Sequence, residues 1–218
     1  TGYQSNYHSH ILQALTYSQY DTSHRSIQLP INIAVRQIYD SLLDVDFSFK
    51  HFCDEINEGL KILIDCGAYQ DSSLTTKQVF DINSRKISKI PWEELTHIVI
   101  SHAHADHCGL LPLVMREELG FRGKIICTEA SQPLISLNCQ DAAFVMGTQV
   151  RVWNKANPKK PIMPLFGIDH ASELVKYLQG YGYNEQIPLS PNVSIELIPT
   201  GHLLGDASII IEYRKDEY

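Results

Sequence analysis

The chain has 218 residues, a formal net charge of −7 at pH 7 and a hydrophobic content of 44%. A chain of this size can bury a core, and it fits one domain or part of a larger one. No apolar run is long enough to cross a bilayer, and residues 1–9 lack the basic and apolar regions of a secretion signal. A cytoplasmic protein without membrane contact is therefore expected, with its oligomeric state left open.

The net charge and the cysteine content bear on three kinds of feature: disulfide bonds, thiolate metal sites and phosphate-binding surfaces. The five cysteines are odd in number and form no Cys-x-x-Cys pair, so neither a disulfide framework nor a thiolate zinc site is indicated. The negative charge argues against a surface coated in phosphate-binding cations. Two basic clusters can still contact phosphates, or can be ordinary solvated loop charge: Arg85, Lys86 and Lys89, and Lys155, Lys159 and Lys160.

The first part of the chain carries the weakest pattern. Residues 1–45 are predicted to be an N-terminal extension or a divergent start of the domain, and residues 46–218 the main domain. A short helix is predicted around Ile11 to Tyr17. Hydrophobicity alternates in the segments Ile31 to Tyr39 and Asp46 to Cys53. This pattern is consistent with two strands, or with one strand and one helix.

A nearly continuous apolar run from Lys61 to Cys66 predicts a central strand buried on both faces. Asp65 closes this strand. A buried carboxylate needs partners, and a metal-binding histidine needs an acceptor for its second ring N–H, which makes Asp65 a candidate for that role. The alternative is a turn or capping carboxylate before Gly67.

The next elements follow in close order. Residues 71–89 are polar and predict a loop with some helix, and Pro91 to Leu95 predicts a one-turn helix with proline at its start. The β-branched segment from His97 to Ser101 predicts a short buried strand. Pro112 begins a predicted helix that ends at Gly120.

Four polar side chains lie in six residues between that strand and that helix: His102, His104, Asp106 and His107. Neutral imidazole and carboxylate are the usual ligands of a borderline cation such as zinc. His102 and His104 can share one ion, while Asp106 and His107 project to the other side of the loop, where a second ion can lie. A chance group of surface histidines is the alternative, and it leaves polar groups uncompensated beside a buried strand.

Strands and helices alternate through the rest of the chain, which predicts an α/β domain with helices packed on sheet faces. The predicted strands are 124–127, 193–199 and 207–214, the predicted helices are 128–141 and 169–180, and 154–164 is predicted to be a flexible excursion. His202 lies in the loop between the last two strands.

The His-x-His-x-Asp-His loop resembles the signature of the metallo-β-lactamase superfamily. Two other stretches support the resemblance: Ile62-Leu63-Ile64-Asp65-Cys66-Gly67 and Pro199-Thr200-Gly201-His202-Leu203-Leu204-Gly205. It covers about Lys61 to Tyr213. It implies the N-terminal part of an αββα sandwich, with His102, His104, Asp106, His107 and His202 as ligands of two zinc ions, and with Asp65 and Asp106 as the candidate catalytic carboxylates. Manganese or iron suits the same ligand types.

The long interval between His104 and His202, together with the Gly201-His-Leu-Leu-Gly sequence, resembles the β-CASP branch, whose members cleave RNA. This implies a metal-dependent phosphodiesterase acting on RNA. Two alternatives are a thioester hydrolase like glyoxalase II and a non-catalytic scaffold subunit. The family's fourth motif, an Asp that bridges both metals, normally follows the last predicted strand, but the chain ends at Tyr218. The isolated chain is therefore expected to have little activity.

Overall fold

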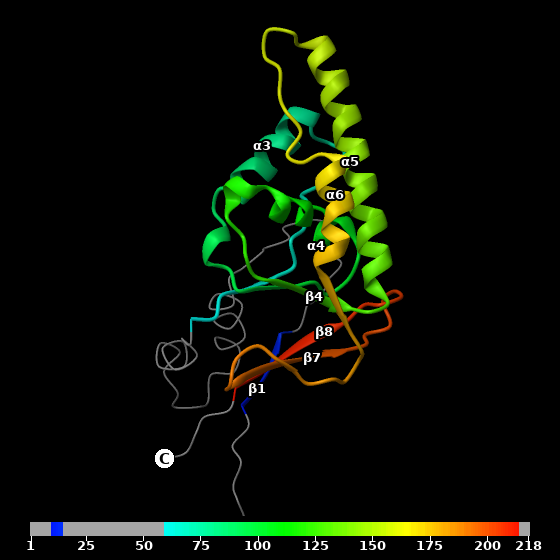
Figure 1. Cartoon of the computed structure of the whole chain (residues 1–218). Coiled ribbons are helices and arrows are strands. Elements are labelled where there is room, and N and C mark those ends of the chain that lie inside the picture. The colour runs from blue at the N-terminus through cyan, green and yellow to red at the C-terminus, as the bar shows by residue number, and fades with distance from the viewer. Residues whose placement is uncertain (1–9, 15–58, 214–218) are drawn as a thin grey trace, which may run out of the picture.

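The computed structural model describes residues 10–14 and 59–213, and Figure 1 shows two sheets with helices gathered on one side. The first sheet is parallel, in the order β2-β3-β4-β5. Its strands are β2 (Ile62–Ile64), β3 (His97–Val99), β4 (Lys124–Thr128) and β5 (Leu178–Tyr181). The second sheet is antiparallel, in the order β1-β8-β7-β6. Its strands are β1 (His10–Ala14), β6 (Ile187–Pro188), β7 (Val193–Ile198) and β8 (Ser208–Tyr213).

Helices cover the face of the parallel sheet that points away from the second sheet (Figure 1). The α-helices are α3 (Thr76–Ile87), α4 (Ala105–Cys108), α5 (Ser131–Ala156) and α6 (Ile168–Leu174), and the 3-10 segments are η1 (Trp92–Glu94), η2 (Leu111–Met115), η3 (Glu117–Leu119) and η4 (Val175–Tyr177). Among these described helices, none combines the length and the apolar character that a membrane span requires.

The alternation of side chains along the parallel strands explains the layers. Leu63, Ile98 and Ile125 point to the helices and join the larger core cluster. Their neighbours Ile62, Val99 and Ile126 point the other way and pack on β7 and β8 in a second cluster. Because successive residues of a strand face opposite sides, strands buried on both faces are continuously apolar. The predicted α/β class is confirmed, and the described part supplies one helical layer and two sheets of the sandwich.

The carboxyl ends of β2 and β3 and the loop before β8 meet at one edge of the structure. The backbone N–H of Asp65 donates to the carbonyl of Val99 over 2.9 Å, which joins the ends of β2 and β3. The backbone N–H of Ala207 donates to the carbonyl of Ser101, also over 2.9 Å, which joins the start of β8 to the loop after β3. Loops that are far apart in the sequence are thereby held side by side.

Gly67 allows an unusually close approach between two of these loops. The backbone N–H of Cys66 donates to the carbonyl of His107 over 2.7 Å, and that of Ala68 donates to the carbonyl of Ala105 over 2.9 Å. A Cβ atom on Gly67 would lie 1.5 Å from the carbonyl oxygen of Asp106. Only glycine fits between these two backbone segments, because a contact of that length is impossible between atoms that are not bonded.

The structure corrects several predicted elements. The helix predicted from Ile11 is wrong over Ile11–Ala14, because these residues form β1 and pair with β8. The helix predicted to end near Asp141 continues to Ala156, since no proline lies between these two residues and Gly147 alone does not end a helix. The predicted one-turn helix at Pro91 to Leu95 is confirmed by η1.

Two other helical predictions are also revised. The helix predicted over residues 169–180 is wrong from Leu178 onward, because α6 ends at Leu174, one 3-10 turn follows and β5 then begins. The segment that starts at Pro112 does end at Gly120, which has a φ of 70°, but it consists of 3-10 turns. The polar stretch 71–89 contains the regular helix α3, which begins with a capping box between Thr75 and Gln78.

The predicted boundary at residues 45 and 46 stays a prediction. It lies outside the described residues, as do the segments Ile31 to Tyr39 and Asp46 to Cys53.

Replacing Gly67 with alanine should lower the free energy of unfolding by at least about 1–3 kcal/mol, because the added methyl forces two backbone segments apart. Gly147→Ala is the matched control, since a Cβ added to Gly147 in α5 would meet nothing within 4 Å. The control should gain about 0.5–1 kcal/mol through helix propensity. Urea unfolding measures both variants, and equal stabilities would contradict the close approach at Gly67.

Candidate metal centre

The loop after β3 presents its polar side chains through a single helical turn. β3 ends at Val99, and α4 begins at Ala105. The carbonyl of His104 accepts the backbone N–H groups of His107 and Cys108, each over 2.9 Å. This turn places Asp106 and His107 on the helix and His104 at its N-cap. The side-chain amide of Asn138 in α5 donates to the carbonyl of Ala103 and holds the loop from the helical side.

The structure brings together three of the predicted ligands, His102, His104 and His202. Their candidate ligand atoms all lie within 4.8 Å of one another. His104 Nδ1 lies 3.1 Å from His102 Nε2 and 3.3 Å from His202 Nε2. Two nitrogens that bind one tetrahedral zinc at about 2.0–2.1 Å lie about 3.3–3.4 Å apart. The three rings therefore fit a single divalent ion.

The three histidines differ in their surroundings. His102 is buried, whereas His104 and His202 are exposed. Burial, helped by the charge of neighbouring His107, lowers the pKa of His102 from 6.5 to about 4. The His102 ring is therefore neutral at neutral pH, the form in which imidazole binds a metal. The buried histidine forms the floor of the cluster, and the two exposed ones form its open side.

Asp65 anchors this floor. Its carboxylate accepts the backbone N–H of Ser101 over 2.7 Å and the Ser101 hydroxyl over 2.9 Å. It also accepts His107 Nδ1 over 2.6 Å. The backbone of Asp65 has a φ of 60°, a left-handed conformation that aspartate tolerates better than most residues. Asp65 therefore positions His107 and leaves its Nε2 available, while its roles behind a metal ligand and in catalysis stay predictions.

His107 and Asp106 lie beside the three-histidine group. Nε2 of His107 is 3.7 Å from Oδ2 of Asp106, and the ring centroids of His107 and His102 are 3.9 Å apart. Burial acts to lower the pKa of His107, but the hydrogen bond and charge of Asp65, with the charge of Asp106, outweigh it and raise that pKa. The second metal position assigned to this pair stays a prediction.

The loop that carries His202 depends on Asp206. This buried carboxylate accepts the backbone N–H of His202 over 2.7 Å and the hydroxyl of Thr200. Burial acts to raise the pKa of Asp206, but these hydrogen bonds outweigh it and lower that pKa. The carbonyl of Asp206 in turn accepts the hydroxyl of Tyr183 over 2.9 Å. One charged side chain thus fixes both sides of the turn around His202.

Gly205 docks the same loop on the first turn of α5. Its carbonyl accepts the hydroxyls of Thr128 and Ser131, each over 2.6 Å. Gly205 has a φ of 84°, and a Cβ there would lie 2.5 Å from Ser131 Oγ. A side chain at this position would be strained and would push the His202 loop off the helix.

Sequence reasoning missed Ser101 and Asp206. Ser101 looks like the last residue of a strand, but it bridges Asp65 to the histidines, since its Oγ also lies 2.9 Å from His102 Nδ1. Asp206 follows Gly205 directly, and an acid in a short polar turn is usually solvated. Asp206 could have been identified from its position between the predicted His202 loop and an apolar strand, because a charged side chain buried there needs hydrogen-bond partners.

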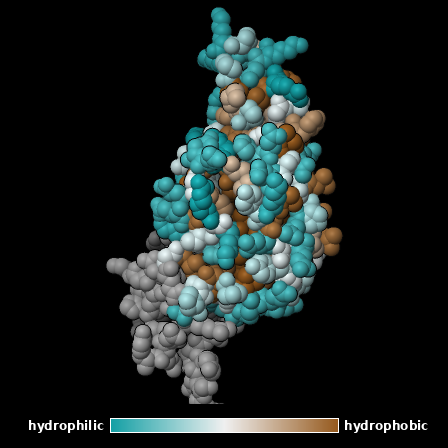
Figure 2. All heavy atoms as spheres, viewed as in Figure 1, coloured by the Kyte–Doolittle hydropathy of each residue, from teal (hydrophilic) through white to brown (hydrophobic). Residues whose placement is uncertain are grey.

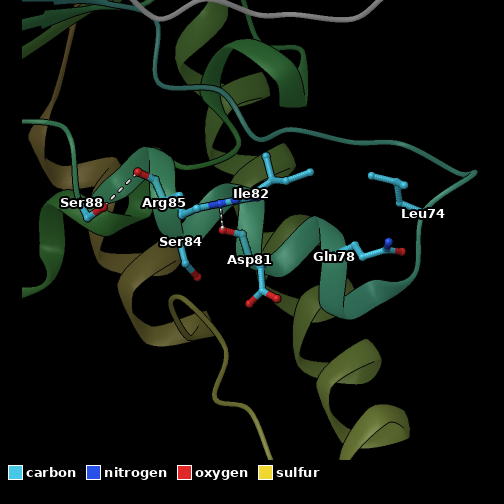
Figure 3. Close-up of a pocket in the computed structure, with 7 residues that line it drawn as sticks. All are labelled: Leu74, Gln78, Asp81, Ile82, Ser84, Arg85 and Ser88. Carbon is cyan, nitrogen blue, oxygen red and sulfur yellow. Dashed lines mark hydrogen bonds between the residues drawn. The ribbon is translucent and has the colours of Figure 1, made fainter.

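A separate hollow of about 680 Å³ lies along α3 (Figure 3). Its lining residues are Leu74, Gln78, Asp81, Ile82, Ser84, Arg85 and Ser88. None of these is a predicted metal ligand or catalytic residue, and Arg85 is one of the cations that the sequence analysis names as able to contact phosphates. The hydrogen bonds drawn in Figure 3 stay within the helix, from Arg85 Nε to the carbonyl of Asp81 and from Ser88 Oγ to the carbonyl of Arg85. The histidine group is therefore a separate feature from this hollow.

Residues 55–118, which include the histidine loop, match the sequence model of the Metallo-beta-lactamase superfamily. The predicted resemblance is confirmed over these residues, which are similar in sequence to that superfamily. The superfamily binds divalent metal, in keeping with the grouped histidines.

Similar proteins include transcription termination factor FttA from Cenarchaeum symbiosum, 29% identical over 67% of this chain and 20% of its own. A second is a ribonuclease from Thermus thermophilus, 26% identical over 71% of this chain and 30% of its own. A solved subclass B3 metallo-beta-lactamase from a soil metagenome library aligns with 16% identity and a TM-score of 0.39, over 74% of this chain and 51% of its own. The chain spans about a fifth to a third of the length of these two curated relatives.

Replacing Asp206 with alanine should weaken divalent-metal binding about 10-fold, because residues that orient a ligand contribute about this much. Isothermal titration with zinc measures the affinity. Tyr183→Phe is the control: it removes a hydrogen bond to the Asp206 carbonyl and leaves the carboxylate in place, so zinc affinity should not change. Equal losses in the two variants would show that general loosening, and not the carboxylate, is responsible.

Proposed function

We propose that the chain belongs to a zinc-dependent phosphodiesterase that cleaves RNA in the cytoplasm. The observation that carries the proposal is the convergence of His102, His104 and His202 on one point from loops 98 residues apart. The ribonuclease named among its relatives supports RNA as the substrate. Manganese or iron would suit the same ligands.

Five residues of the chain would bind metal, and Asp65 would orient one of them. His102, His104 and His202 would hold the first ion, and Asp106 and His107 would hold a second. The bound metal would supply Lewis-acid chemistry at a phosphodiester. Asp65 keeps Nδ1 of His107 occupied and so directs Nε2 outward. The exposure of His104 and His202 leaves the open side of the group free for a large substrate such as a nucleic acid strand.

His202 links the second sheet to the candidate site, so its loss gives a direct test of the ligand set. His202→Ala should weaken zinc binding by at least about 100-fold, since even groups behind a ligand contribute about 10–100-fold. His170→Ala is the matched control, because His170, in α6, accepts the backbone N–H of the N-cap residue Gly167 and lies outside the histidine group. Metal analysis after dialysis measures both, and equal zinc content would remove His202 from the site.

The substrate class is tested by incubating the chain with zinc or manganese and with two substrates, an end-labelled RNA and a glutathione thioester. The proposal expects slow RNA cleavage, because the isolated chain is expected to have little activity, and His104→Ala should abolish this cleavage through loss of a metal ligand. Thioester turnover with intact RNA would favour a hydrolase like glyoxalase II. An excess of the chain over substrate makes slow cleavage measurable, and turnover of neither substrate under these conditions at full zinc occupancy would favour a scaffold role.

A further inference from the structure

The outer face of α5 combines an exposed aromatic side chain with cations. Phe144, Arg151 and Lys155 are spaced seven and four residues apart, which places them along one face of a helix. All three are exposed, Phe144 by 66%. Arg151 Nη2 donates to the hydroxyl of Thr148 over 3.0 Å, which draws the guanidinium back along the helix toward Phe144.

The loop after α5 is folded back on the helix and adds two more cations, Lys159 and Lys160. Asn154 holds the loop with two hydrogen bonds to Ile162. The side-chain amide of Asn154 donates to the carbonyl of Ile162, and the backbone N–H of Ile162 donates to Oδ1 of Asn154. The indole N–H of Trp153 donates to the carbonyl of Lys160. The loop is therefore hydrogen-bonded to α5 at Lys160 and Ile162, and residues 154–156 of the predicted excursion belong to the helix itself.

These cations form a local excess of positive charge on a negative protein. The sequence contains no Asp or Glu between Asp141 and Asp169, and its cations there are Arg151, Lys155, Lys159 and Lys160. The chain as a whole has a net charge of −7. Figure 2 shows hydrophilic side chains gathered at the end of the molecule that α5 and this loop form. Four like charges held together repel one another, and a polyanion relieves that repulsion.

We propose that Phe144, Arg151, Lys155, Lys159 and Lys160 form a track that binds the single-stranded part of an RNA substrate outside the histidine site. The proposal rests on the proposed function. Cations that follow a phosphate backbone, with an aromatic ring on which a base can stack, are the two components of sequence-independent single-strand binding. Asp141 is the acidic residue nearest in sequence, and it lies at the end of the track closer to the histidines.

The length of α5 sets how far an RNA must extend to reach the cations. Asn138 contacts the histidine loop through the carbonyl of Ala103. At about 1.5 Å per residue, Arg151 lies about 20 Å and Lys155 about 26 Å along the helix from Asn138. At about 3.4 Å per nucleotide of a helical strand, this corresponds to roughly six to eight nucleotides. A tetranucleotide bound at the histidines would not reach the cations of the track.

The experiment compares labelled RNAs of 4 and 20 nucleotides bound to the full 218-residue chain. The track variant carries Arg151→Gln, Lys155→Gln and Lys160→Gln. For the 20-nucleotide RNA it should lose about 10- to 100-fold in affinity, and the slope of log K against log salt should fall by about 2. Binding of the 4-nucleotide RNA should not change. Phe144→Ala should lose about 5-fold or more on the longer RNA.

The control variant removes the same charge from exposed positions outside both basic clusters, with Arg122→Gln, Lys124→Gln and Lys176→Gln. Tyr177→Ala, at an exposed aromatic side chain in η4, is the control for Phe144→Ala. Both controls should bind the longer RNA within about threefold of the unaltered chain.

Equal losses of affinity in the track and control variants, or equal losses on both RNA lengths, would overturn the track. RNA cleavage with an unchanged KM in the track variant would sink the track alone, and failure of the unaltered chain to bind either RNA would sink the track and the proposed function together.

Discussion

The buried carboxylate of Asp65 is the interaction on which the candidate site depends. It accepts two hydrogen bonds from Ser101 and one from His107, so both oxygens are occupied. A buried charge is costly unless it is fully hydrogen-bonded. The most stable arrangement for Asp65 is therefore also the one that places the loop after β3 against the end of β2. Gly67, two residues on, removes the side chain that would prevent that approach.

The local part of the site could be predicted because its signal lies in adjacent residues. His102, His104, Asp106 and His107 are separated by so few bonds that any strand-to-helix turn holds them near one another. The strands from Ile62 and His97 were equally clear, since strands buried on both faces are apolar without interruption. The placement of His202 beside His104 could be predicted only from the resemblance to a family. These residues are 98 apart in the sequence, and the residues around each of them do not show how far apart they lie in the fold.

The misplaced elements are those whose identity depends on a distant partner. Leu178 continues an apolar helical pattern that Gly180 was predicted to end, yet both residues form β5 because β4 offers a free edge that pairs with them. Ile11 to Ala14 likewise extend the second sheet through β8, about two hundred residues later. Asp206 shows the same limit in a side chain, since its partners Thr200 and His202 become close only after the turn has formed. Local propensity is overridden in each case by pairing that only the folded chain provides.

Helix α5 connects the parts of the structure that carry the functional proposals. Its first turn binds the loop of His202 through Ser131, and its second turn holds the loop of His104 through Asn138. The last turns carry Arg151 and Lys155, well beyond the sheet (Figure 1). Because a helix is stiff and rises by a fixed amount per residue, the separation between histidines and cations is set by the number of residues between Asn138 and Lys155. The proposed RNA track therefore has its cations at a fixed distance from the histidines, on turns of α5 that also hold the following loop through Asn154.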